Sequence, residues 1–183
     1  MASNRQKPPP KPISPARLEE MAVHYAARYA TSRAKLSDYL HRKLRERGWA
    51  GETPPDVAAL VERLSDLRYV DDEAFATMRG TALSRRGYGT RRITAALDEA
   101  RIGQEDRGEA LNLVARESWQ AANIFARRKR LGPYAAERVT REARQKQIAA
   151  FVRAGHDFAT AARWVDAAPG EPPPGEDDED DMG

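Results

Sequence analysis

The stretch Tyr69-Val70-Asp71-Asp72-Glu73-Ala74-Phe75, followed by Arg85-Arg86-Gly87-Tyr88-Gly89-Thr90-Arg91-Arg92-Ile93, indicates a helical hairpin. Asp71 can accept hydrogen bonds from the free backbone amides of a first helical turn, and Asp72 and Glu73 add negative charge near the positive end of the helix dipole. Gly87 provides a left-handed residue that ends this helix, and Thr90 is the expected N-cap of the next one. The sequence therefore predicts an acidic helix entrance and an arginine-rich corner.

The four arginines of this corner differ in what they indicate. Arg85 and Arg86 lie at the end of a predicted helix, where the dipole favours cations, so local stability alone accounts for them. Arg91 and Arg92 lie in the first turn of the following helix, where the dipole opposes them by about a few tenths of a kcal/mol. We therefore expect a carboxylate or an anionic ligand to hold Arg91 and Arg92.

Composition excludes several classes of protein. The 183 residues are 40% hydrophobic with a mean hydropathy of -0.76, which is polar but still compatible with a globular fold. The chain has no Cys, which removes disulfides, thiolate zinc sites and cysteine nucleophiles, and a reducing cytoplasm is the simplest location. The longest apolar run, residues 148–152, is far too short to span a membrane, and the N-terminal residues do not resemble a signal peptide.

The net charge of +3 hides a strong asymmetry along the chain. Residues 168–183 contain seven acidic residues and no Lys or Arg, which leaves 31 basic and 21 acidic residues in the remainder. A body with a net charge of +10 favours a polyanion or an acidic protein surface as a partner. An arginine-rich genome composition is the alternative explanation for part of this excess.

Helix signals recur at intervals of about 50 residues, a spacing typical of stacked repeats. Ser14-Pro15 starts a helix, Gly48 ends one, and Thr53-Pro54-Pro55-Asp56 caps a third whose apolar stripe is Val57, Leu60, Val61, Leu64 and Leu67. The predicted fold is all-α, with three tandem three-helix repeats in an elongated, curved array. The expected boundaries are a disordered basic Pro-rich tail at 1–13, repeats at 14–68, 69–116 and 117–167, and a disordered acidic tail at 168–183.

The sequence offers no convincing catalytic or cofactor site. His24, His41 and His156 lie in three different units without metal-ligand spacing, and we expect them at helix surfaces or boundaries. Asp71-Asp72-Glu73 could be read as a metal cluster, but helix capping explains it more simply. No phosphate-binding loop occurs, and Gly87-Tyr88-Gly89 is too short for a dinucleotide fingerprint. We therefore predict neither an enzyme, nor a metal site, nor a cofactor.

Basic clusters are the remaining signal, one in each predicted repeat. A solvated helix face is the alternative for each cluster taken singly, but three aligned clusters would suit an elongated acidic partner. The candidate partner-binding residues are Arg85, Arg86, Tyr88, Arg91 and Arg92 in the second unit, Lys43, Arg45 and Arg47 in the first, and Arg127, Arg128, Lys129 and Arg130 in the third.

The segments Leu67 to Ala76 and Arg85 to Ile93 closely resemble the middle repeat of the RecX family of bacterial recombination regulators. The residues that carry this structural motif are Tyr69, Asp71, Asp72, Phe75, Gly87 and Gly89. Arg68 stands where the family usually has glycine, and Thr90 replaces the usual proline. The resemblance is looser over residues 17–166, and the third repeat is the weakest match.

This resemblance implies an all-helical protein that binds the filament of the RecA recombinase and inhibits its strand-exchange, ATPase and coprotease activities. The predicted function is therefore a non-enzymatic, monomeric and cytoplasmic regulator of DNA repair, homologous recombination and the SOS response, with RecA as partner and DNA as a further candidate. The alternative is a direct DNA-binding helical module, because Gly87 with its flanking helices is similar to a helix-turn-helix. A phosphoryl-transfer enzyme that uses the acidic triplet is a weaker third reading.

Overall fold

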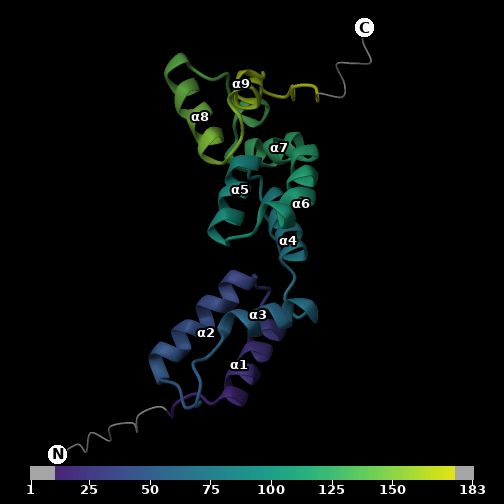
Figure 1. Ribbon diagram of the computed structural model, residues 1–183. Helices are drawn as coiled ribbons and strands as arrows, with labels where there is room; N and C mark the ends of the chain where they lie inside the picture. Colours follow the sequence, from purple (N-terminus) through teal and green to yellow (C-terminus); the bar gives the residue numbers. More distant parts are fainter. Residues whose placement is uncertain (1–10, 176–183) are drawn as a thin grey trace, which may run out of the picture. The chain divides into compact units, whose positions relative to one another are not determined.

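A computed structural model describes residues 11–175, and over this range the chain forms nine α-helices, one short 3-10 helix and no β-strand (Figure 1). The predicted all-α class is therefore confirmed. The predictions for residues 1–10 and 176–183 lie outside the described residues. The chain divides into two compact units, Met1–Asp72 and Glu73–Gly183, each described here by itself.

Unit 1 contains α1 (Pro15–Arg28), α2 (Arg33–Arg47) and α3 (Val57–Asp66). Each helix begins at a side-chain cap: Ser14 accepts a hydrogen bond from the Arg17 amide, Ser32 from Lys35 and Asp56 from Ala59. The third helix therefore starts three residues later than expected, with Asp56 rather than Thr53 as its N-cap. Gly48 ends α2 with φ +79, as predicted.

The core of unit 1 includes a residue that we had assigned to the disordered tail. Ile13 is fully buried among the apolar faces of the three helices. Its amide donates to Gly48 O at 3.0 Å, and its carbonyl accepts from the Ala50 amide at 2.9 Å. The tail thus ends before Ile13, because this side chain completes the core and its backbone pairs with the turn after α2.

The C-terminal boundary of unit 1 is held by a buried carboxylate. Asp72 accepts the Arg33 amide at 2.8 Å and the Arg33 Nε at 3.2 Å. The sequence predicts that Asp72 places negative charge at the start of its own helix, and the structure adds a hydrogen bond to Arg33, 39 residues away in sequence. Leu67, expected on the buried stripe, is 60% exposed because α3 ends at Asp66 and the chain turns at Arg68, whose φ is +60.

Unit 2 contains α4 (Asp72–Ser84, whose first residue belongs to unit 1), α5 (Thr90–Glu99), α6 (Gln104–Arg116), α7 (Ser118–Lys129), η1 (Gly132–Tyr134), α8 (Arg141–Arg153) and α9 (Phe158–Asp166). Buried residues of α4 to α6 form two small clusters, around Phe75 and around Leu83. A larger cluster around Phe125, Phe151 and Trp164 joins α7, α8 and α9.

The described helices fall three by three into the predicted ranges 14–68, 69–116 and 117–167. That they are three copies of one repeat, stacked in a curved array, stays a prediction. Helices α4 to α9 lie together in one compact unit, so the strongest division in the described chain is near Asp72.

The start of the predicted acidic tail is ordered by backbone contacts. The Gly170 amide donates to Pro133 O at 2.9 Å, and Arg163 Nη2 donates to Pro174 O at 2.8 Å. Residues 168–175 therefore lie against η1 and α9, because Pro133 and Arg163 form hydrogen bonds with their backbone. Among the described residues, no helix combines the length and the apolar character that a membrane crossing needs.

Candidate partner-binding site

The turn after α4 has the geometry that its sequence predicts. Gly87 has φ +79, its amide donates to Ser84 O at 2.8 Å, and the Tyr88 amide donates to Leu83 O at 3.2 Å. Tyr88 folds back against the cluster around Leu83, Ile93 and Val114. A Cβ on Gly87 would lie 2.8 Å from the Phe125 amide nitrogen, so the turn also sits directly against α7.

The start of α5 is fixed by the turn between α8 and α9. The Gly89 amide donates to Ala154 O at 2.9 Å, and the Arg91 amide donates to Gly155 O at 3.1 Å. A Cβ on Gly89 would lie 2.4 Å from Gly155 O, so only glycine allows this approach. Gly89 is also the N-cap of α5, and Thr90 is the first helical residue rather than the cap that we expected. No capping side chain is needed at this position. The Gly155 carbonyl accepts the hydrogen bond of the Arg91 amide, which a capping side chain would otherwise accept.

His156 completes this junction and was not recognised as a site residue from the sequence. Its side chain is buried, its Nε2–H donates to Gly87 O at 3.1 Å, and the rings of Phe125 and Phe151 lie 5.7 and 5.4 Å from its own. Burial lowers the pKa of His156, so the folded chain favours the neutral imidazole. Its hydrogen-bond partner, Gly87, is 69 residues away in sequence, and no local sequence pattern predicts this contact.

His156 makes the stability of unit 2 dependent on pH. Because its pKa is lower in the folded than in the unfolded chain, the free energy of unfolding should fall as pH drops below about 6.5, by at most about 1.4 kcal/mol per pH unit for one proton. His156→Gln should remove this slope in urea titrations from pH 8 to pH 5, whereas His24→Gln, on the exposed face of α1, should retain it. An unchanged slope in His156→Gln would show that another group carries the pH dependence.

Two of the three predicted basic clusters meet at this junction. Arg128, near the end of α7, donates from Nη1 to Arg86 O, and its guanidinium lies 5.6 Å from the ring centre of Tyr88. The Arg86 guanidinium lies 5.5 Å from the same ring. We use the name arginine corner for the eight exposed cations of these two clusters, of which Arg86 and Arg128 contact Tyr88: Arg85, Arg86, Arg91, Arg92, Arg127, Arg128, Lys129 and Arg130.

The charge of the arginine corner is not neutralised within the described chain. None of its eight cations forms an ion pair with a carboxylate of residues 11–175, although ion pairs form elsewhere in this range. No carboxylate partner of Arg91 or Arg92 is found in this range, and an anionic ligand for these two arginines stays a prediction. Arg86 and Arg92 also line a cavity of about 210 Å³ together with Arg79, Tyr88 and one carboxylate, Glu99.

The basic cluster of unit 1 is partly explained by local contacts. Lys43 Nζ lies 2.6 Å from the Glu46 carboxylate, and this hydrogen bond lowers the pKa of Glu46. Arg47 Nε donates to Lys11 O at 3.1 Å, and Arg45 is exposed beside a cavity. The assignment of Lys43, Arg45 and Arg47 to a partner site stays a prediction, as does that of the arginine corner.

The motif residues divide into buried and exposed groups. Phe75 is buried in unit 2, whereas Tyr69 is half-exposed and Asp71 pairs with Arg68 at 2.9 Å directly before α4. Arg68 has φ +60, a conformation that favours glycine, so the arginine here occupies a backbone position suited to glycine. Among the described residues, no group of three or more His, Cys, Asp or Glu side chains could hold a metal ion.

Comparisons with known proteins were made by sequence and by structure. No family model matches the chain. The chain is 35% identical over 170 residues to "Regulatory protein RecX" of Myxococcus xanthus (strain DK1622), covering 87% of this chain and 90% of that relative. It is 37% identical over 98 residues to "Regulatory protein RecX" of Mycobacterium sp. (strain KMS), covering 52% and 51%.

Two crystal structures share the fold. RecX from Lactobacillus salivarius has a TM-score of 0.61 and 17% identity, covering 80% of this chain and 90% of that one. A second structure, of a regulatory protein RecX, has a TM-score of 0.57 and 17% identity, covering 79% and 70%. These likenesses support the helical architecture.

Proposed function

The chain belongs to the RecX family of regulatory proteins, and from this premise we propose that it regulates the RecA recombinase. In this proposal the protein binds the RecA filament without catalysing a reaction, inhibits strand exchange, ATP hydrolysis and coprotease activity, and so restrains homologous recombination, DNA repair and the SOS response. It acts as a cytoplasmic monomer without a cofactor. RecA enters here through the family name, not through a contact seen in the structure.

One observation carries the assignment of the binding surface. The arginine corner consists of eight exposed cations from the turn after α4, the first turn of α5 and the end of α7, with no carboxylate partner in the described chain. Its backbone is held by Gly89, Gly155 and His156, so the cations are presented from a rigid base. Preorganised positive charge of this kind suits an acidic protein surface, or phosphates at the surface of a nucleoprotein filament.

Arg91→Ala with Arg92→Ala should weaken inhibition of RecA ATP hydrolysis on single-stranded DNA. Two exposed charge contacts are worth about 1–2 kcal/mol together, so the concentration for half-inhibition should rise about 5- to 30-fold. Arg116→Ala is the matched control, because this arginine is exposed at the end of α6 outside the arginine corner. Equal inhibition by the double variant and the control would overturn the site assignment.

The DNA-binding alternative is tested by a separate measurement of DNA binding. Binding to DNA alone would survive without RecA, and its affinity would fall steeply as salt rises. Anisotropy of labelled duplex DNA with and without RecA, at two salt concentrations, separates the two readings. Loss of RecA-free duplex binding in the double variant would favour a direct DNA-binding module at the arginine corner.

A further inference from the structure

Three tyrosines lie together on the surface of unit 1, and we call them the tyrosine stack after the parallel pair that they contain. The rings of Tyr25 on α1 and Tyr39 on α2 are nearly parallel, with an interplanar angle of 17° and ring centres 4.1 Å apart. Tyr29, directly after α1, has its ring centre 5.0 Å from that of Tyr25, is tilted by 50° against it and is 49% exposed. Tyr25 and Tyr39 rest partly on the core, so the stack has a firm base and an exposed end.

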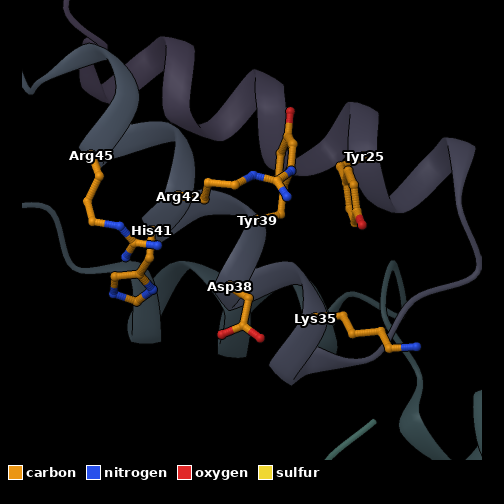
Figure 2. A pocket seen from close by; sticks show the side chains of 7 residues that line it. All are labelled: Tyr25, Lys35, Asp38, Tyr39, His41, Arg42 and Arg45. Carbon is orange, nitrogen blue, oxygen red and sulfur yellow. The ribbon is translucent and has the colours of Figure 1, made fainter. Parts of the chain in front are cut away.

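Cationic side chains surround this stack. The Arg42 guanidinium lies 5.7 Å from the ring centre of Tyr39, and that of Arg28 lies 5.7 Å from the ring centre of Tyr29. In Figure 2, Tyr39 lies between Tyr25 and the Arg42 side chain. A cavity of about 420 Å³ runs beside them and is lined by Lys35, Arg42 and Arg45, with Asp38 as its single carboxylate.

We propose that the tyrosine stack binds single-stranded nucleic acid, with an unpaired base stacked at its exposed end and adjacent phosphates beside Lys35, Arg42 and Arg45. Aromatic faces among cations are the combination that single strands require, because every base offers a flat π-surface and every linkage a negative charge. A duplex hides its base faces, and an acidic peptide would use the cations but not the rings. The proposal does not rest on the RecA proposal, because it needs no recombinase and shares only Arg45 with the residues predicted above to bind a partner.

The test measures binding of the full chain to three labelled 20-nucleotide probes by fluorescence anisotropy, without RecA. The probes are oligo-dT, an abasic strand of equal length and charge, and a duplex. Wild type should bind oligo-dT at least about fivefold more tightly than the abasic strand. Equal affinity for these two probes would overturn the proposal, because charge alone would then explain binding.

Variants at the exposed tyrosine locate the site. Tyr29→Ala should lower affinity for oligo-dT at least about fivefold while affinity for the abasic strand stays unchanged, and Tyr29→Phe should restore wild-type binding. Tyr69→Ala is the matched control, because Tyr69 is a half-exposed tyrosine of unit 1 outside the stack. Circular dichroism checks that each variant is folded.

Charge variants separate the phosphate contacts from the base contact. Arg42→Ala should weaken binding to both single strands and reduce the slope of log affinity against log salt by about 0.7. Wild-type affinity of Tyr29→Ala for oligo-dT, or no binding of any probe by the wild-type chain, would overturn the proposal. Binding of a poly-Glu peptide in place of oligo-dT would identify the surface as a protein docking site instead.

Discussion

Gly155→Ala should lower the free energy of unfolding of unit 2 by about 2–5 kcal/mol. Gly155 has φ +98, and placing a side-chain-bearing residue in a left-handed conformation costs about 1–2 kcal/mol. The added Cβ would lie 2.4 Å from the Arg92 amide nitrogen and 2.7 Å from Gly89 O, and overpacking against backbone adds about 1–3 kcal/mol. Because these atoms hold the first turn of α5, the variant should also loosen Arg91 and Arg92.

Urea unfolding followed by tryptophan fluorescence in a Trp49→Phe background measures this effect, since Trp119 and Trp164 then report on unit 2. Two glycine controls separate the causes. Gly48→Ala has the same kind of positive φ but open space around it, so it should cost only the backbone term, about 1–2 kcal/mol, read by circular dichroism. Gly108→Ala, in the interior of α6 with no atom within 4 Å of the new Cβ, should stabilise the chain by about 0.5–1 kcal/mol.

Equal losses for Gly155→Ala and Gly48→Ala would contradict the close packing of Gly89 on Gly155. The two turns would then differ only in position, and the backbone of the arginine corner would not depend on the turn between α8 and α9. The comparison therefore tests the geometry that presents Arg91 and Arg92, independently of any partner.

Features set by neighbouring residues could be read from the sequence. The cap at Ser14 and the left-handed turns at Gly48 and Gly87 follow from residue type and local spacing, and the structure has each of them. The RecX resemblance likewise rests on short motifs around α4 and α5. Such signals are local because the hydrogen bonds they describe close within one helical turn.

Features set by distant residues could not be read in the same way. The sequence indicates that Asp72 places charge at a helix start, but not that it accepts a hydrogen bond from Arg33. It places His156 at a helix surface or boundary, but does not indicate its hydrogen bond to Gly87. The sequence indicated that Arg86 and Arg128 belong to basic clusters but not that the two clusters meet. Whether the arginine corner binds RecA stays a prediction, because charge alone does not identify a partner.

Phe151→Ala should lower the free energy of unfolding of unit 2 by about 3–5 kcal/mol. Phe151 belongs to α8, and its ring is fully buried. The ring centre lies 4.7 Å from that of Phe125 on α7 and 5.4 Å from that of His156 in the turn after α8. Truncation to alanine removes these contacts and leaves a cavity that the surrounding helices can fill only in part. The same fluorescence assay in the Trp49→Phe background measures the loss.

Phe158→Ala is the matched control for this truncation, because Phe158 is 63% exposed at the start of α9 in the same unit. It should change the free energy of unfolding by no more than about 0.5 kcal/mol. Similar losses for the two variants would mean that α7, α8 and α9 do not pack around Phe151. The Phe151 carbonyl also accepts a hydrogen bond from the His156 amide at 3.2 Å. Similar losses would therefore also mean that α8 does not support the turn of Gly155 and His156, which contacts the backbone of the arginine corner.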